Sequence, residues 1–214
     1  MELIVVIALA IATLFTALAS FAQTTKRVIH FLSLQAAAVG FVELMYCFIN
    51  LIVGLHVEAL ISFLATFTEW FSCAVVSPLI IYWGMTQTEN SLDQPIMGTR
   101  SATLMVITIA LSHLTLGWWS MFLLPTKLET LPFCALMLSL SVFVMATRKD
   151  PLKILAGLNL AENALYPLLA ESPLSVIPFL LGLMIFVNLA AVFVIVQAHH
   201  EYGTSLITKW RWTS

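Results

Sequence analysis

The sequence predicts an all-α, polytopic membrane protein with seven transmembrane helices and a weak internal repeat. Of its 214 residues, 61% are hydrophobic and 9% are charged, whereas soluble domains carry roughly a quarter of charged residues. A helix needs roughly 20 apolar residues to cross the hydrocarbon core of a bilayer. The apolar runs give seven candidate spans, at residues 2–23, 28–54, 58–85, 101–124, 129–147, 152–170 and 174–198.

The first three spans form the predicted N-terminal membrane half, residues 1–85. Span 2–23 has no basic segment before its apolar run, so we interpret it as a retained helix rather than a signal peptide. Span 28–54 places Gln35, Glu43 and Asn50 on one side of a helix, at spacings of eight and seven residues. Span 58–85 carries Glu69 in its middle and Pro78 nine residues later, where the missing N–H should kink the helix or free a carbonyl group.

The polar segment 86–100 predicts a cytoplasmic loop between the two halves. The predicted C-terminal half, residues 101–198, has four spans, and a cytoplasmic tail follows at 199–214. Its first span contains His113 and an interfacial tryptophan pair, Trp118 and Trp119. The later spans carry four further polar residues inside apolar runs, namely Asn159, Glu162, Asn163 and Asn188.

The internal repeat follows from the placement of these polar residues. In each half a basic loop precedes a helix with an intramembrane glutamate, and the next helix carries a second polar residue. The interval from Glu43 to Glu69 equals the interval from Glu162 to Asn188. The repeat therefore predicts that the two polar residues of each pair lie at similar depth.

The basic residues predict the orientation in the membrane. Lysine and arginine concentrate in cytoplasmic loops, and Lys127 is the one basic residue on the opposite side. We therefore expect a multi-pass protein of the cytoplasmic membrane with its N-terminus outside and its C-terminus in the cytoplasm, and nucleic acid is not an expected partner. The other eight basic residues are Lys26, Arg27, Arg100, Arg148, Lys149, Lys153, Lys209 and Arg211.

The carboxylates Glu43, Glu69 and Glu162 are the candidate functional residues. An ionisable side chain at the centre of a membrane helix costs about 3 kcal/mol on insertion scales and usually faces a bundle interior or a water-filled path. They could form an ion relay, or each could stay protonated and only hydrogen-bond a neighbouring helix. Five further side chains could belong to the relay or hold helices together: Gln35, His113, Asn159, Asn163 and Asn188.

We expect neither a metal nor another cofactor. Cys47, Cys73 and Cys134 lie singly in apolar runs, without the spacing of metal ligands. A membrane haem would need two deep histidines on facing helices, and only His113 is deep. The chain has no catalytic centre of its own, so any redox chemistry would belong to partner subunits.

Four stretches carry a family resemblance: Thr25–Tyr46, the Glu69–Trp83 region, Ile154–Tyr166 with Glu162 and Asn163, and Gly203-Thr204. With them the chain resembles the membrane subunit called component E of the hydrogenase-4 type, found in energy-converting NiFe hydrogenases, including those of methanogens. The resemblance covers the whole chain, and its last three spans are also similar to the K subunit of respiratory complex I. There the intramembrane glutamates belong to a proton-pumping axis.

The chain departs from the K-subunit pattern at two positions. Asn159 stands where that subunit has its first glutamate, with Glu162 three residues later, and Val187 or Asn188 stands where it has the second. The resemblance implies antiporter-like and other small membrane subunits as partners and, through them, a soluble NiFe hydrogenase and iron–sulfur module. The expected role is translocation of protons or sodium ions. The alternatives are a structural scaffold in such a complex and an independent small-solute transporter.

Overall fold

The computed structural model describes residues 2–93, 96–123, 130–169, 176–204 and 206–207. These residues are almost entirely helical, and the described part of the chain has no β-strand beyond an isolated bridge between Thr24 and Leu92. The helices are α1 (Glu2–Phe21), α2 (Thr25–Val53), α3 (His56–Glu69), the π-helix η1 (Trp70–Val76), α4 (Ser77–Gln87), α5 (Thr99–Leu123), α6 (Thr130–Thr147), α7 (Pro151–Leu169) and α8 (Val176–Tyr202).

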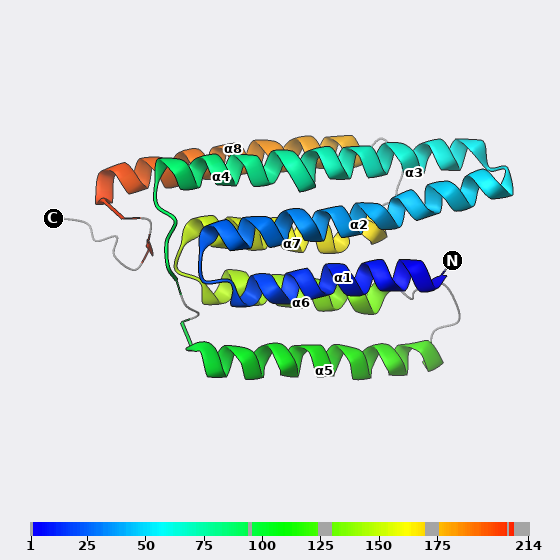
Figure 1. The fold of residues 1–214 in the computed structure, drawn as a ribbon, viewed down its shortest axis with the longest axis horizontal. Coiled ribbons are helices and arrows are strands. Elements are labelled where there is room, and N and C mark those ends of the chain that lie inside the picture. The colour runs from blue at the N-terminus through cyan, green and yellow to red at the C-terminus, as the bar shows by residue number, and fades with distance from the viewer. Residues whose placement is uncertain (1, 94–95, 124–129, 170–175, 205, 208–214) are drawn as a thin grey trace.

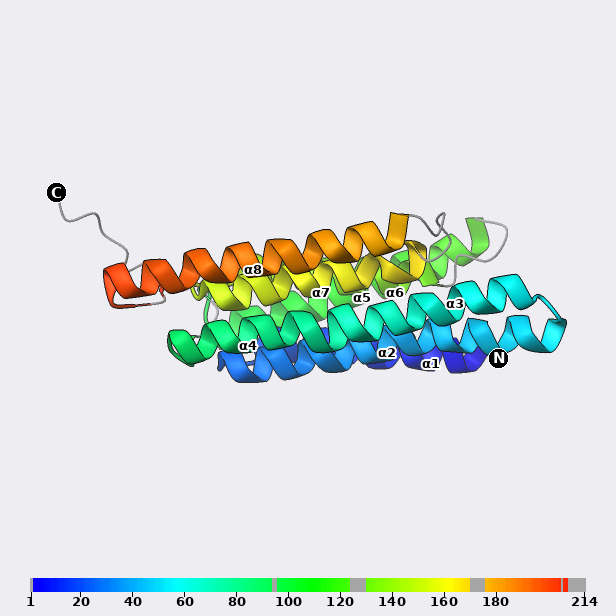
Figure 2. The same ribbon diagram turned by 90° about the horizontal axis from the view of Figure 1, so that it is seen from above.

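The helices run side by side in two layers. The first layer holds α1, α2 and the continuous α3–η1–α4 rod, and the second holds α6, α7 and α8 (Figures 1 and 2). Each helix of the first layer packs on its counterpart in the second: α1 on α6, α2 on α7, and α4 on α8. Helix α5 lies at the edge of the bundle, against α6 and α1 (Figure 1).

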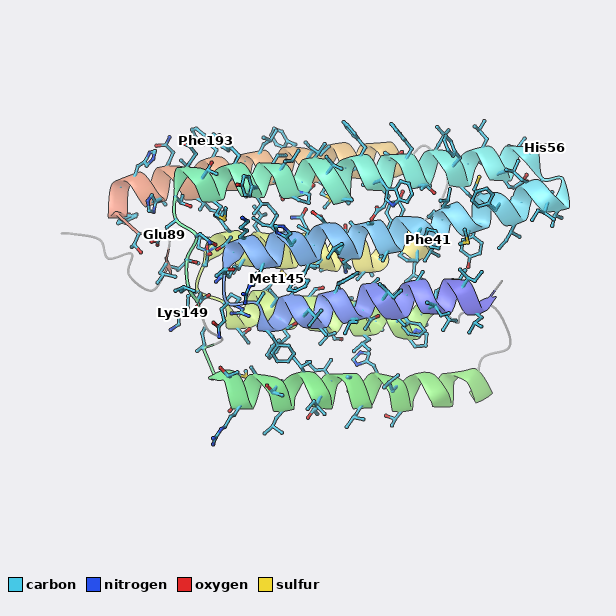
Figure 3. All side chains as sticks on the ribbon, in the orientation of Figure 1. Phe41, His56, Glu89, Met145, Lys149 and Phe193 are labelled. Carbon is cyan, nitrogen blue, oxygen red and sulfur yellow. The ribbon has the colours of Figure 1, made fainter. Side chains whose placement is uncertain are left out.

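The apolar helices are of the membrane-spanning kind. Among the described residues five helical segments are long and apolar enough to cross a bilayer: Leu3–Phe21, Thr25–Val53, His56–Gln87, Thr130–Thr147 and Leu181–Tyr202. Helices α5 and α7 are not among them, and α7 carries Lys153, Asn159 and Glu162 within its length. Apolar side chains such as Phe193, which is 58% exposed, cover the outer faces (Figure 3), as expected for surfaces in contact with lipid.

Local signals explain three of the helix ends. Helix α2 begins at Thr25 because the Thr24 hydroxyl accepts the backbone N–H of Arg27. It ends before Gly54, whose φ of 84° is a left-handed conformation that glycine adopts readily. Helix α8 extends to Tyr202, beyond the predicted limit of residue 198, and Gly203 follows with φ 69°.

The rod from His56 to Gln87 is not a uniform α-helix. Its central segment, Trp70–Val76, is π-helical, and the N–H of Ser77 bonds to the carbonyl of Ser72, five residues earlier. Pro78 follows at the start of α4 and has no N–H to donate. The wider π turn therefore lies directly before the proline at which the sequence predicts a kink or a freed carbonyl.

Candidate intramembrane polar site

Glu69 carries a fully buried carboxyl group in the interior of the bundle. It is the last residue of α3, its side chain is 0% exposed, and neither carboxyl oxygen has a hydrogen-bond partner among the described residues. Its polar neighbour is Cys73, one turn further along, and a thiol is only a weak donor. A buried carboxyl group without a hydrogen bond is costly, so Glu69 is a candidate functional residue.

The structure brings Glu43 and Glu69 together. Glu43 lies on α2 and is 4% exposed, and its carboxyl group interacts electrostatically with that of Glu69. Helices α2 and α3 are antiparallel and joined by the short turn at Gly54 (Figure 2). Two buried carboxyl groups therefore lie within electrostatic range of each other in the interior of the bundle.

Close packing of α2 and α3 encloses this pair. A Cβ placed on Gly40 would lie 2.5 Å from Nε1 of Trp70 and 3.2 Å from Cγ of Glu69. The indole N–H of Trp70 donates to the carbonyl of Ala37 at 3.1 Å. On the other side the hydroxyl of Tyr166, on α7, donates to the carbonyl of Ala65 at 2.8 Å. The absence of a side chain at Gly40 is what lets α2 pack closely on α3 and η1 beside Glu69.

Gln35 joins three helices toward the basic-loop end. Its Nε2 donates to the hydroxyl of Thr16 on α1 and to the carbonyl of Leu160 on α7, each at 3.1 Å. Its Oε1 accepts from Nδ2 of Asn163 at 3.1 Å. The other amide atom of Asn163, Oδ1, is buried without a partner among the described residues. This amide oxygen is a second buried acceptor that is open to a donor.

Asn159 and Asn188 form a reciprocal amide pair between α7 and α8. Each Nδ2 donates to the other Oδ1 at 2.8 Å. Asn188 also donates to the hydroxyl of Ser77 on α4 at 3.0 Å, and Asn159 to the carbonyl of Leu155 at 2.8 Å. These side chains connect helices by satisfied hydrogen bonds.

Glu162 and His113 lie apart from the acidic pair. Glu162 is partly buried on α7 and interacts electrostatically with Cys73. His113 donates from Nδ1 to the carbonyl of Ile109 at 2.9 Å, which leaves Nε2 to accept from the hydroxyl of Ser139 on α6 at 3.0 Å. His113 therefore connects α5 to α6 in this structure.

The basic residues of the loops divide into two groups. Lys26 and Arg27 are exposed, and Lys149 is partly exposed at the end of the bundle where the loops gather (Figure 3). Arg148 and Lys153 are instead buried, at 3% and 0% exposure. The same end buries Asp93 and Asp150. We call Asp93, Arg148, Asp150 and Lys153 the inter-loop cluster.

Hydrogen bonds of the inter-loop cluster tie three connections together. Arg148 donates to the backbone carbonyls of Ser20 and Asp93, and Lys153 to those of Gln23 and Ser91. Burial lowers the pKa of Arg148, and the two aspartates oppose this effect. The cluster fixes the α1–α2, α4–α5 and α6–α7 connections.

The acidic residues of the cluster accept the remaining donors. Asp150 accepts from the hydroxyls of Thr25 and Ser91 and from the backbone N–H of Leu152. Asp93 accepts from the backbone N–H groups of residues 149 and 150. Sequence reasoning missed both aspartates, and the one signal for Asp150 was its place between two bases directly before a helix.

The described residues contain no group of three or more histidine, cysteine, aspartate or glutamate side chains placed to hold a metal ion. The three cysteines are buried and unpaired, and they pack as small apolar residues. Trp118, Trp119 and Lys127 belong to segments whose side chains lie outside the described residues.

The fold and this site define a class: a helical membrane protein whose bundle interior holds two carboxyl groups and an amide network. No protein-family model, curated protein or solved structure matches the chain. The arguments below therefore depend on its own geometry and on the resemblance stated above.

Proposed function

We propose that this chain is a membrane subunit of an energy-converting, hydrogenase-like complex and contributes carboxylates to proton or sodium translocation. The observation that carries the proposal is Glu69, which is fully buried, has no hydrogen-bond partner among the described residues and interacts with Glu43. Intramembrane ionisable residues commonly mark ion paths.

The contrast with the amides favours this role over simple helix adhesion for the acidic pair. Asn159 and Asn188 show how a buried polar residue holds helices together here, through short bonds to side chains on other helices. Glu69 makes no such bond to the described residues. Its carboxyl group is therefore available to a proton, a water molecule or a cation, and the adjacent π-helix is a local irregularity common at functional sites.

The arrangement of the bundle supports the rest of the proposal. Helices α5 and α7 run alongside the five apolar segments (Figure 1), so we take all seven to cross the membrane. The pairing of α1, α2 and α4 with α6, α7 and α8 is what an internal repeat of three helices would give. The basic-loop connections lie at the end opposite the N-terminus (Figure 1), which agrees with an N-terminus outside and a cytoplasmic C-terminus.

Redox chemistry would occur in partner subunits, as the resemblance to the hydrogenase-4 component E implies. The membrane partners would be antiporter-like and small complex I-like subunits. A structural scaffold is the second candidate, and the amide hydrogen bonds that join α2, α4, α7 and α8 favour it.

The test replaces each carboxylate by its amide in the intact complex. Glu43→Gln and Glu69→Gln keep size and hydrogen-bonding capacity but remove the titratable proton. Glu58→Gln is the matched control, because Glu58 lies exposed in the first turn of α3. Redox-driven proton and sodium uptake would be measured in sealed vesicles, and the particle mass in mild detergent would report assembly.

We expect the two buried variants to assemble normally and to lose translocation several-fold, while Glu58→Gln behaves as the parent. Normal translocation by both buried variants would refute the ion path and leave the scaffold. A particle with the mass of this chain alone would refute the complex and favour the small-solute transporter.

A further inference from the structure

The outer surface of α4 carries two shallow apolar grooves, one on each side of the helix. The first, about 450 Å³, lies between α2 and the η1–α4 segment, and the second, about 280 Å³, lies between α4 and α8. Leu79 is 60% exposed and lines both grooves. It therefore forms a ridge between the two grooves.

The depth of the grooves matches one leaflet of a bilayer. Along the rod the first groove is lined from Ala74 to Tyr82 and the second from Val76 to Trp83, or about 12 Å and about 10 Å at the rise of an α-helix. A single leaflet contributes about 15 Å of hydrocarbon. Each groove thus covers most of the hydrocarbon depth of the leaflet at the basic-loop end of the bundle.

Side chains with a polar tip stand toward that end of each groove. His30 and Tyr82 line the first groove, and Trp83 lines the second. Tyrosine and tryptophan favour the boundary between hydrocarbon and headgroups. The groove lining is therefore apolar where acyl chains would lie and polar toward the loops, where a phospholipid headgroup would lie.

Two exposed cations lie beside the first groove. Lys26 and Arg27 occupy the first turn of α2, four and three residues before His30 and so on the same side of the helix. The ring of His30 donates from Nδ1 to the carbonyl of Lys26 at 2.9 Å. Glu89 lies in the neighbouring α4–α5 connection, next to Asn90, whose side chain accepts the backbone N–H of Lys26. The headgroup end of the groove therefore carries two cations against one carboxylate.

We propose that this surface binds one anionic phospholipid with two acyl chains. Its phosphate lies at Lys26 and Arg27, and one acyl chain occupies each groove on either side of Leu79. The two cations at the rim favour an anionic headgroup, and the two grooves favour a lipid with two acyl chains.

The test is native mass spectrometry of the purified full chain, with phosphatidylglycerol and phosphatidylcholine of the same acyl composition as probes. We expect the protein to retain phosphatidylglycerol preferentially. Lys26→Gln and Arg27→Gln should each lower that preference about fivefold, the value typical of one basic residue at an anionic surface. Arg100→Gln is the matched control, because Arg100 is exposed at the same end but on α5, at the far edge of the bundle.

Two further arms test the acyl chains and the source of the phosphate. Ser33→Phe places a ring in the first groove and should reduce retention of both phospholipids. Lysophosphatidylglycerol, with one chain, should bind more weakly than the two-chain lipid, and soluble glycerol phosphate should not displace it. Equal retention of the two phospholipids by the parent would overturn the proposal, as would displacement by glycerol phosphate or an equal loss in Arg100→Gln.

Discussion

Asn188→Leu should destabilise the bundle, because it removes three hydrogen bonds between helices. The amide of Asn188 makes two of these bonds with Asn159 and one with Ser77, at 2.8 to 3.0 Å. Hydrogen bonds between helices inside a membrane average about 0.6 kcal/mol each, so the expected loss of unfolding free energy is about 2 kcal/mol. Leucine has a similar volume, which limits the contribution of a cavity.

A double-mutant cycle isolates the Asn159–Asn188 pair. The unfolding free energy of the parent, Asn159→Leu, Asn188→Leu and the double variant would be measured in detergent micelles by titration with a denaturing detergent. We expect a coupling of about 1 kcal/mol, from two of the bonds. Val187→Leu is the control, since this neighbour is 38% exposed on the outer face and should change stability little. A coupling near zero would refute the view that the amide pair holds α7 to α8.

Gly40→Ala should destabilise the bundle by about 1 to 3 kcal/mol through overpacking, because the new Cβ would lie 2.5 Å from the neighbouring indole. In the control Gly182→Ala the new Cβ meets no atom within 4 Å, so this variant should be neutral or more stable by up to about 1 kcal/mol. Equal unfolding free energies for the two variants would contradict this packing. Asp150→Ala should cost more than about 2 kcal/mol, since three donors lose their acceptor, whereas exposed Glu201→Ala should change stability little. A cysteine at Leu92, which is 77% exposed in the α4–α5 connection, should react with an impermeant maleimide only from the cytoplasmic side, and labelling from outside would reverse the proposed orientation.

The apolar runs predicted the helices well, because membrane helices depend on length and hydrophobicity more than on tertiary context. The predicted span 152–170 corresponds to α7, Pro151–Leu169, and span 129–147 to α6, Thr130–Thr147. The end of α8 was less predictable. The sequence predicts a polar tail at His199, His200 and Glu201, yet polar residues can continue a helix beyond the apolar region, and this helix continues to Tyr202, directly before Gly203.

The inter-loop cluster could not be predicted in the same way. Positive charge in a loop indicates the side of the membrane, but it does not distinguish an exposed lysine from a buried one. Arg148 and Lys153 can be buried because their side chains donate hydrogen bonds to backbone carbonyls of distant connections. Those contacts join residues that lie far apart in the sequence, so no local spacing indicates them.

The polar pairs of the two halves show what spacing does and does not determine. Glu43 and Glu69 are separated by the same interval as Glu162 and Asn188. In the first half the two residues interact, but in the second Asn188 bonds to Asn159, one turn before Glu162. The sequence interval across a helical turn sets depth, whereas the rotation of each helix about its axis decides which side chain faces the partner. Equal intervals therefore produce a carboxyl pair in one half and an amide pair in the other, which is why Glu69 rather than Glu162 is the carboxylate whose replacement tests the proposed ion path.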